Sequence, residues 1–437
     1  MQKPEKLIFT ILFFSIFATI TGVGIVVPLL PVYAHELGAS GIYIGLIFGA
    51  FSLSRTIFLP YFGHLSDKKG RKPLIVAGLL AYTLVSIAFL LTTDIKSLIL
   101  IRFIQGIASA MLMPVIQAYV GDITPAGREG LTMGLFNMSI FLGLSLGPVL
   151  GGLIHDSISL EAAFLGMGGL SFIGFLLSFF LLPPTRNEKS VQRGTPEVKW
   201  RQLVQNWEIT GLFFFRFSYT ACIGIIWGFL PVLANAELSL SSTSIGFLVM
   251  LGILISGVFQ LPMGYLADRI KKKTMVISGG LLVSYAVFSY SWADQFSDMV
   301  LASFFFGIGG GICMPALMAT AVIIGDKTLA MGSVMAWLTV AHSMGMLAGS
   351  MLAGLMMDFF SLRAAFPVGA LIMILGLAAF IYSTRQGAAA LAGCPTEKSA
   401  CKPAGIYNES FGFHHHQPLN QTAEETDPGT TDGAIDK

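Results

Sequence analysis

Four basic side chains lie inside long apolar stretches of the sequence: Arg55, Arg102, Arg216 and His342. A cation buried in a membrane costs roughly 2.5–3.5 kcal/mol, so it normally faces a cavity or a partner. Guanidinium groups bind anions, and an imidazole can carry a proton near neutral pH. We therefore expect Arg55 and Arg216 to face a substrate cavity. His342 suits a cavity or a packing role, and Arg102, with Gln105 one turn later, suits the cavity or a side chain extended toward a nearby membrane surface.

The acidic side chains are placed differently. All 24 carboxylates fall in expected loops, at the ends of expected helices or in the C-terminal tail. A cationic molecule at mid-depth would therefore meet arginines instead of a counter-ion, so neutral or anionic substrates fit better. A proton that binds within the apolar part of the chain would use His342, or an acid at a helix end such as Glu36, Asp122 or Asp156.

The composition is that of a membrane protein. The 437 residues are 54% hydrophobic and 11% charged, with a mean hydropathy of +0.76, whereas soluble domains carry about 25% charged residues. Apolar runs of about twenty residues predict membrane-spanning helices, and the first run is too long for a signal peptide. Twelve spans are predicted, over residues 7–31, 42–63, 74–93, 97–121, 130–155, 162–183, 209–235, 243–266, 275–293, 298–324, 329–357 and 363–384.

A short charged turn occurs twice, at equivalent places. "GHLSDKKGRK" (63–72) follows the second predicted span, and "GYLADRIKKK" (264–273) follows the eighth. Each begins with glycine, has an aspartate four residues later and ends in cations. Two such turns predict two similar halves, as in transporters built from parallel repeats.

The polar segments indicate where the chain divides into domains and how it is oriented in the membrane. We predict an all-α integral membrane protein of two pseudo-symmetric six-helix bundles, 1–183 and 209–385, joined by a cytoplasmic linker at 184–208. Residues 386–437 have the composition of a disordered tail. With both termini cytoplasmic, twenty-one of the 26 lysines and arginines lie inside and two outside, which is the bias that orients membrane proteins.

The first charged turn resembles the signature of the major facilitator superfamily, Gly-x-Leu-x-Asp-Arg-x-Gly-Arg-Lys. Gly63, Asp67, Gly70 and Arg71 fit it, and a lysine replaces the first arginine. The resemblance implies a latch that holds the two halves together on the cytoplasmic side. Asp67 is then expected near residues 328–331, at the start of the eleventh span. The remaining latch residues that the resemblance implies are Asp122, which should pair with Arg71, and Asp268 in the second turn.

The fifth predicted span resembles the antiporter signature of the same family, Gly-x8-Gly-x3-Gly-Pro-x2-Gly-Gly. Glycines four residues apart share one helix face and allow close packing, and a proline bends the helix. The eleventh span has a partial copy at Gly345, Gly349 and Gly354. The matching residues of the fifth span are Gly134, Gly143, Gly147, Pro148, Gly151 and Gly152.

These resemblances imply a secondary transporter of the drug:proton antiporter branch, which exports small drug-like molecules or metabolites by alternating access. We expect no enzyme activity, cofactor, metal or nucleic-acid partner. The expected partners are a small-molecule substrate, protons as the driving force, and the lipid bilayer of the plasma (inner) membrane. Two alternatives stay open: an organic-anion carrier or uptake system that uses Arg55 and Arg216, and a membrane receptor or scaffold that signals through its tail.

Overall fold

The computed structural model describes residues 3–125, 128–183, 206–328 and 331–392, and every regular element in these ranges is helical. Twelve stretches are long and apolar enough to cross a membrane, and α1 and α2 together form the first of them. The helices of the first half are α1 (Lys3–Val26), α2 (Leu29–Glu36), α3 (Gly41–Lys69), α4 (Arg71–Leu90), α5 (Ile95–Asp122), α6 (Glu129–Ser157) and α7 (Leu160–Leu181). Those of the second half are α9 (Trp207–Ala236), α10 (Ser242–Arg269), α11 (Lys272–Ser289), α12 (Phe296–Thr328), α13 (Met331–Phe359) and α14 (Ala365–Ala392), with 3₁₀ turns at Tyr290–Trp292 and Leu362–Ala364.

The observed helices match the twelve predicted spans, and two differences, in the first span and the last, have local causes in the sequence. The first span is broken between Val26 and Leu29, where Pro28 has no N–H to donate to the helix. The last helix continues past Arg385 to Ala392, through an alanine-rich segment that favours helix. Most of the predicted linker (184–205) and of the predicted tail (393–437) lies outside the described residues.

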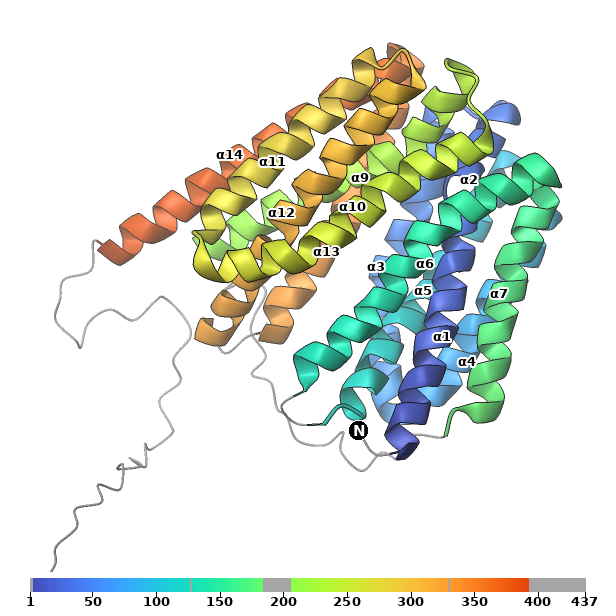
Figure 1. Cartoon of the computed structure of the whole chain (residues 1–437), viewed down its shortest axis with the longest axis horizontal. Helices are drawn as coiled ribbons and strands as arrows, with labels where there is room; N and C mark the ends of the chain where they lie inside the picture. The colour runs from blue at the N-terminus through green and yellow to red at the C-terminus, as the bar shows by residue number, and fades with distance from the viewer. Residues whose placement is uncertain (1–2, 126–127, 184–205, 329–330, 393–437) are drawn as a thin grey trace, which may run out of the picture. The chain divides into compact units, whose positions relative to one another are not determined.

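The two halves repeat the same helix contacts. In the first half α1 packs on α6 and α7, and α5 packs on α3 and α4. In the second half α9 packs on α13 and α14, and α12 packs on α10 and α11. Each half is therefore a six-span bundle, and the second bundle repeats the first (Figure 1).

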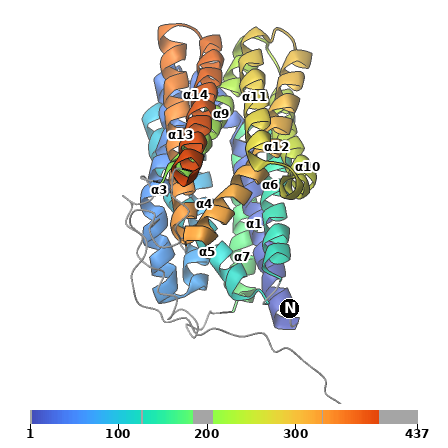
Figure 2. The same ribbon diagram turned by 90° about the vertical axis from the view of Figure 1, so that its left-hand side faces the viewer.

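Two helix pairs join the bundles, α3 with α13 and α6 with α10 (Figures 1 and 2). We call the face that carries the turns 68–72 and 269–273 the basic face, and the other end of the helices the opposite face. Near the opposite face the paired helices are in tight contact, since a Cβ added at Gly45 would lie 2.5 Å from the Ser350 carbonyl oxygen. At the basic-face ends of α3 and α10, a Cβ added at Gly63 or Gly264 would meet nothing within 4 Å.

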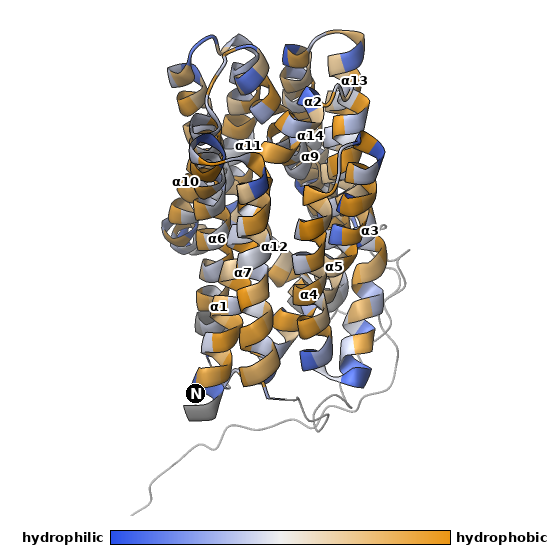
Figure 3. Cartoon of the chain, turned by 90° about the vertical axis from the view of Figure 1, so that its right-hand side faces the viewer, coloured by the Kyte–Doolittle hydropathy of each residue, from blue (hydrophilic) through white to orange (hydrophobic). Residues whose placement is uncertain are grey.

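The outer surface of the bundles is apolar along most of its length (Figure 3). Large hydrophobic side chains such as Leu261 and Leu84 are 83% and 57% exposed. In water such a surface would aggregate, whereas in a bilayer it contacts lipid tails. The chain is therefore a multi-pass membrane protein, and the basic and polar residues at the helix ends mark its two aqueous faces.

Candidate functional site

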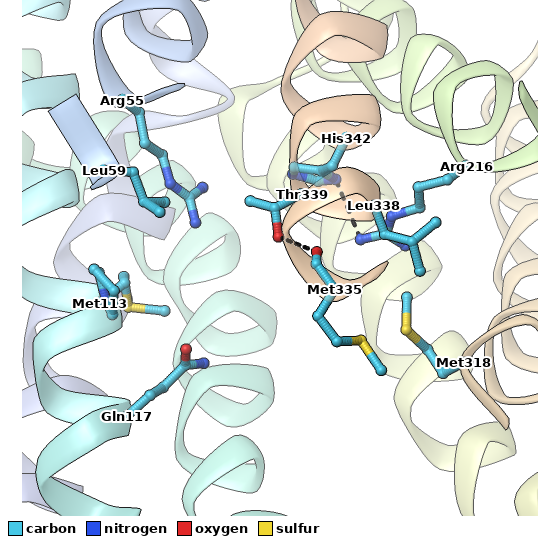
Figure 4. Close-up of a pocket in the computed structure, with 11 residues that line it drawn as sticks. Arg55, Leu59, Met113, Gln117, Arg216, Met318, Met335, Leu338, Thr339 and His342 are labelled. Carbon is cyan, nitrogen blue, oxygen red and sulfur yellow. Dashed lines mark hydrogen bonds between the residues drawn. The ribbon is translucent and has the colours of Figure 1, made fainter. Parts of the chain in front are cut away.

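A cavity of about 320 Å³ lies between the two bundles, and its lining extends from the middle of α3 toward the basic-face ends of α5 and α13. Helices α3 and α5 line it on one side, and α9, α12 and α13 line it on the other (Figure 4). Its volume is at the lower end of the range for small-molecule sites, roughly 300–1,000 Å³. The lining residues are Arg55, Leu59, Met113, Pro114, Gln117, Arg216, Met318, Met335, Leu338, Thr339 and His342.

Arg55 is the central residue of α3, about 21 Å along the helix from either end. Figure 4 shows its side chain extending from α3 toward α13 across the cavity. The Nε atom of Arg55 is buried and has no hydrogen-bond partner among the described residues. An unsatisfied donor on a cation is costly to bury, so burial of this Nε–H group is unfavourable unless a further acceptor reaches it.

Arg216 and His342 lie together on the other side of the cavity. A guanidinium nitrogen of Arg216 is 3.3 Å from His342 Nδ1, and another is 3.3 Å from the sulfur of Met314. Because arginine can only donate, Nδ1 accepts this hydrogen bond and the imidazole is uncharged here. Three of the side chains that the sequence suggests for a cavity, Arg55, Arg216 and His342, therefore line a common one.

Arg102 and Gln105 take a different position. Arg102 is only 5% exposed, donates to the Ile47 carbonyl oxygen (3.2 Å) and to Gln105 Oε1 (2.7 Å), and its guanidinium lies over the Phe48 and Phe51 rings. These contacts hold α5 against α3. Neither residue lines the cavity, and Arg102 is buried against protein instead of extending to a surface.

The first basic turn forms an ionic cluster. Arg71 donates to Asp67 Oδ1 (2.6 Å), to Ser66 Oγ (2.5 Å) and to Asp122 Oδ2 (3.1 Å). The expected pair between Arg71 and Asp122 is therefore present, and it ties the end of α5 to the turn between α3 and α4. Gly70 has a φ of +87°, a conformation that only glycine adopts without strain.

The partners expected across the bundles from this turn are not described. Residues 329–330 and the neighbouring side chains at the start of α13 lie outside the described residues, and so does the side chain of Asp268. Asp67 itself is about half exposed. The role of this turn as a latch therefore stays a prediction.

The glycine motif of α6 packs on two different helices. A Cβ at Gly147 would lie 2.5 Å from the Thr21 carbonyl oxygen, and one at Gly143 would lie 3.0 Å from that of Phe17. Gly151 is as closely packed against Ile25, so these three glycines hold α6 against α1. The matching glycines of α13, at 345 and 349, pack on α9 in the same way.

Two of the remaining motif residues of α6, Pro148 and Gly152, face the other bundle. A Cβ at Gly152 would overlap the backbone of Ser242 in α10, and one at Gly246 of α10 would overlap the Pro148 carbonyl. Gly134, near the basic face, would meet nothing within 4 Å. The motif therefore builds both the core of the first bundle and its contact with the second bundle near the opposite face.

Two aspartates on the opposite face bind across the bundles. Asp156, at the end of α6, accepts hydrogen bonds from the backbone nitrogens of Ser242 (3.1 Å) and Thr243 (2.8 Å) at the start of α10. Asp358, at the end of α13, accepts from the backbone nitrogens of Gly41 (2.5 Å) and Ile42 (2.9 Å) at the start of α3. A carboxylate at a helix N-terminus is stabilised by the exposed N–H groups and the helix dipole.

We call these two contacts the carboxylate clamps. From the sequence, Asp156 is expected only as a proton candidate, and Asp358 is not singled out. A signal for both was present, because "GLIHDSISLEAAF" (152–164) and "GLMMDFFSLRAAF" (354–366) share glycine, aspartate, serine and the final alanines and phenylalanine at the same spacing. The clamps are thus equivalent positions of the internal repeat.

Comparison with known proteins agrees with this architecture. The family model described as Major Facilitator Superfamily matches residues 12–225 and 212–396. An uncharacterized MFS-type transporter, MJ1560, of Methanocaldococcus jannaschii is 27% identical over 380 residues, which cover 86% of this chain and 97% of that protein. The quinolone resistance protein NorA of Staphylococcus aureus is 28% identical over 359 residues, covering 80% of this chain and 89% of NorA.

A solved structure shares the fold. The crystal structure of the human organic anion transporter MFSD10 (TETRAN) aligns with a TM-score of 0.62 at 20% sequence identity, covering 87% of this chain and all of that one. At this identity the likeness shows the fold alone. Together with the family match over most of the chain, it leads to one conclusion: the chain belongs to the Major Facilitator Superfamily and is a membrane transporter, not an enzyme.

Proposed function

We propose that the chain exports small organic molecules across the plasma membrane by proton-coupled alternating access. The observation that carries this proposal is the cavity between the bundles, which is lined from both of them and sealed on one side by the clamps. The antiporter motif of α6 and the similarity to NorA, a quinolone resistance protein, support export and proton antiport.

The orientation in this proposal follows from the charges. Among the described residues, most of the lysines and arginines lie at the basic face, including those of the two turns 68–72 and 269–273, so we take it as the cytoplasmic face. Both termini are then cytoplasmic. The clamps close the external side, and the bundles separate toward the cytoplasm, which makes this state the one that receives substrate from inside the cell.

The transport cycle exchanges one set of closing contacts for another. The clamps of Asp156 and Asp358 release when the external side opens. The cluster of Asp67, Arg71 and Asp122, with Asp268 as its weaker counterpart, then closes the cytoplasmic side against the start of α13. Each set consists of hydrogen bonds to charged groups, worth about 1.5–3 kcal/mol each, so neither state is locked.

Inside-out membrane vesicles test the proposal. An acidified lumen reproduces the physiological proton gradient, and an exporter of the antiport type should then accumulate its substrate in the lumen. A panel of fluorescent organic molecules of different charge should yield at least one that accumulates and is released by a protonophore. Accumulation that is indifferent to the proton gradient would contradict the coupling, and accumulation confined to right-side-out vesicles would contradict the direction.

A further inference from the structure

The cavity has an unbalanced charge. Of the eleven described residues that line it, two are arginines and one is histidine, and none is aspartate or glutamate. A cavity lined by arginines without a carboxylate excludes cations and attracts anions.

The described hydrogen-bond partners of Arg55 and Arg216 do not neutralise the positive charge of these side chains. The buried Nε of Arg55 has no hydrogen-bond partner among the described residues. Arg216 has acceptors, but they are the thioether of Met314 and the uncharged ring of His342, both at 3.3 Å. A thioether is a weak acceptor, and neither group is negative, so neither arginine has a counter-ion among the described residues that line the cavity.

The rest of the lining suits an apolar molecule of variable shape. Met113, Met318 and Met335 are flexible and polarizable, and such side chains adapt to different ligands. The hydroxyl of Thr339 is already used, because it donates to the Met335 carbonyl of its own helix (2.9 Å). The arginines are thus the strongest polar recognition elements in a largely apolar site.

We infer that the cargo is an organic anion whose compact acidic group binds between Arg55 of the first bundle and the Arg216–His342 pair of the second. Its apolar body lies against the methionines. This inference rests on the transport function proposed above and names its substrate class. Because the two arginines come from different bundles, an anion between them also draws the bundles together, which favours closing of the cavity on the cytoplasmic side.

The charge of the cavity also limits which residue can carry the exchanged proton. A proton on His342 would add positive charge beside the bound anion, so the two would bind together instead of displacing each other. Exchange of an anion for a proton therefore needs a proton carrier outside the cavity. Of the residues that the sequence suggests, Glu36, Asp122 and Asp156 at the helix ends are the ones to test.

Transport of two matched probes tests the inference. Naphthalene-1-sulfonate and a naphthyl-trimethylammonium cation share an aromatic ring system and carry permanent opposite charges, so neither crosses lipid readily by itself. In proteoliposomes with an imposed pH gradient we expect transport of the sulfonate and not of the cation. Arg55→Gln and Arg216→Gln should each lower sulfonate transport about 10- to 100-fold, since each removes a charge-assisted contact. Lys96→Gln, which removes an exposed cation near the opposite face, should change nothing.

A binding measurement separates loss of recognition from loss of folding. Naphthalene-1-sulfonate should raise the melting temperature of the wild type, as any ligand of the folded state does, and should do so less in Arg55→Gln, with Arg55→Lys in between. Gradient-driven transport of the cation without the sulfonate would overturn the anion inference and leave the export proposal standing. Transport of the sulfonate that is unaffected in both arginine variants would also overturn it. Failure of every organic probe to move would contradict the proposed function itself.

Discussion

Replacing Asp358 by asparagine should weaken the external closure of the protein without unfolding it. The carboxylate of Asp358 accepts hydrogen bonds from the backbone nitrogens of Gly41 (2.5 Å) and Ile42 (2.9 Å). Asparagine is nearly isosteric but uncharged, and only one of its two terminal atoms accepts. The loss of one charge-assisted bond and of the charge–dipole attraction amounts to about 1–2 kcal/mol. This should shift the ratio of externally open to externally closed molecules about 5- to 30-fold.

Distances between spin labels can report this shift. Lys96 and Gln295 are exposed residues near the opposite face, one on each bundle, and can be labelled as cysteines in a background that lacks the four native ones. Pulsed dipolar spectroscopy should show a longer distance component that grows in Asp358→Asn. It should grow further in the double variant with Asp156→Asn, since the two clamps share no residue and their effects should nearly add.

The control is an aspartate that caps a helix within one bundle on the same face. Asp94 accepts from the backbone nitrogen of Ser97 (3.0 Å) at the start of its own helix, α5. Asp94→Asn should lower stability slightly and leave the label distances unchanged. Equal distance shifts in Asp94→Asn and Asp358→Asn would show that the shift comes from a general loss of stability. The clamps would then not hold the external side closed.

Four further predictions concern packing, the basic turn and the tail. Gly147→Val should lower the melting temperature markedly, because its side chain would overlap the backbone of α1, whereas Gly134→Val, with free space around it, should not. Arg102→Gln should also destabilise the protein, by about 2–4 kcal/mol if buried partners are left unpaired, and should leave the substrate preference of the remaining folded protein unchanged. Asp67→Asn should fold normally and lower transport, and unchanged transport would exclude a latch. Deletion of residues 393–437 should leave transport intact, whereas a receptor that signals through its tail would lose its function.

Much of the architecture could be predicted because lipid imposes simple requirements. A helix must cross about 30 Å of hydrocarbon with its backbone groups satisfied, so each apolar run is a span and each charged turn marks an end. The pair between Arg71 and Asp122 was also predictable, since the family that the charged turn resembles implies it. The glycines at 143, 147 and 151 pack as their spacing suggests.

The interior of the site could not be predicted in the same way. In a soluble helix the apolar face identifies the core, but lipid and protein interior are both apolar, so that signal is lost. Met113, Met335 and Leu59 look like lipid-facing residues in the sequence, yet they line the cavity. Arg102 looks like a binding-site residue because it is a cation within an apolar run. Only the fold shows that the Ile47 carbonyl, Gln105 and two aromatic rings already surround it.

Access of a thiol reagent to the cavity would test whether this cavity opens to one side of the membrane at a time. Thr339 lines the cavity and bonds only locally, to its own helix, so Thr339→Cys should preserve the site. A membrane-impermeant maleimide should label this cysteine from the cytoplasmic side, in inside-out vesicles, and not from the external side. Adding Asp156→Asn and Asp358→Asn should make it reactive from the external side as well. Strong labelling of the single variant from outside, or equal labelling from both sides, would contradict the account.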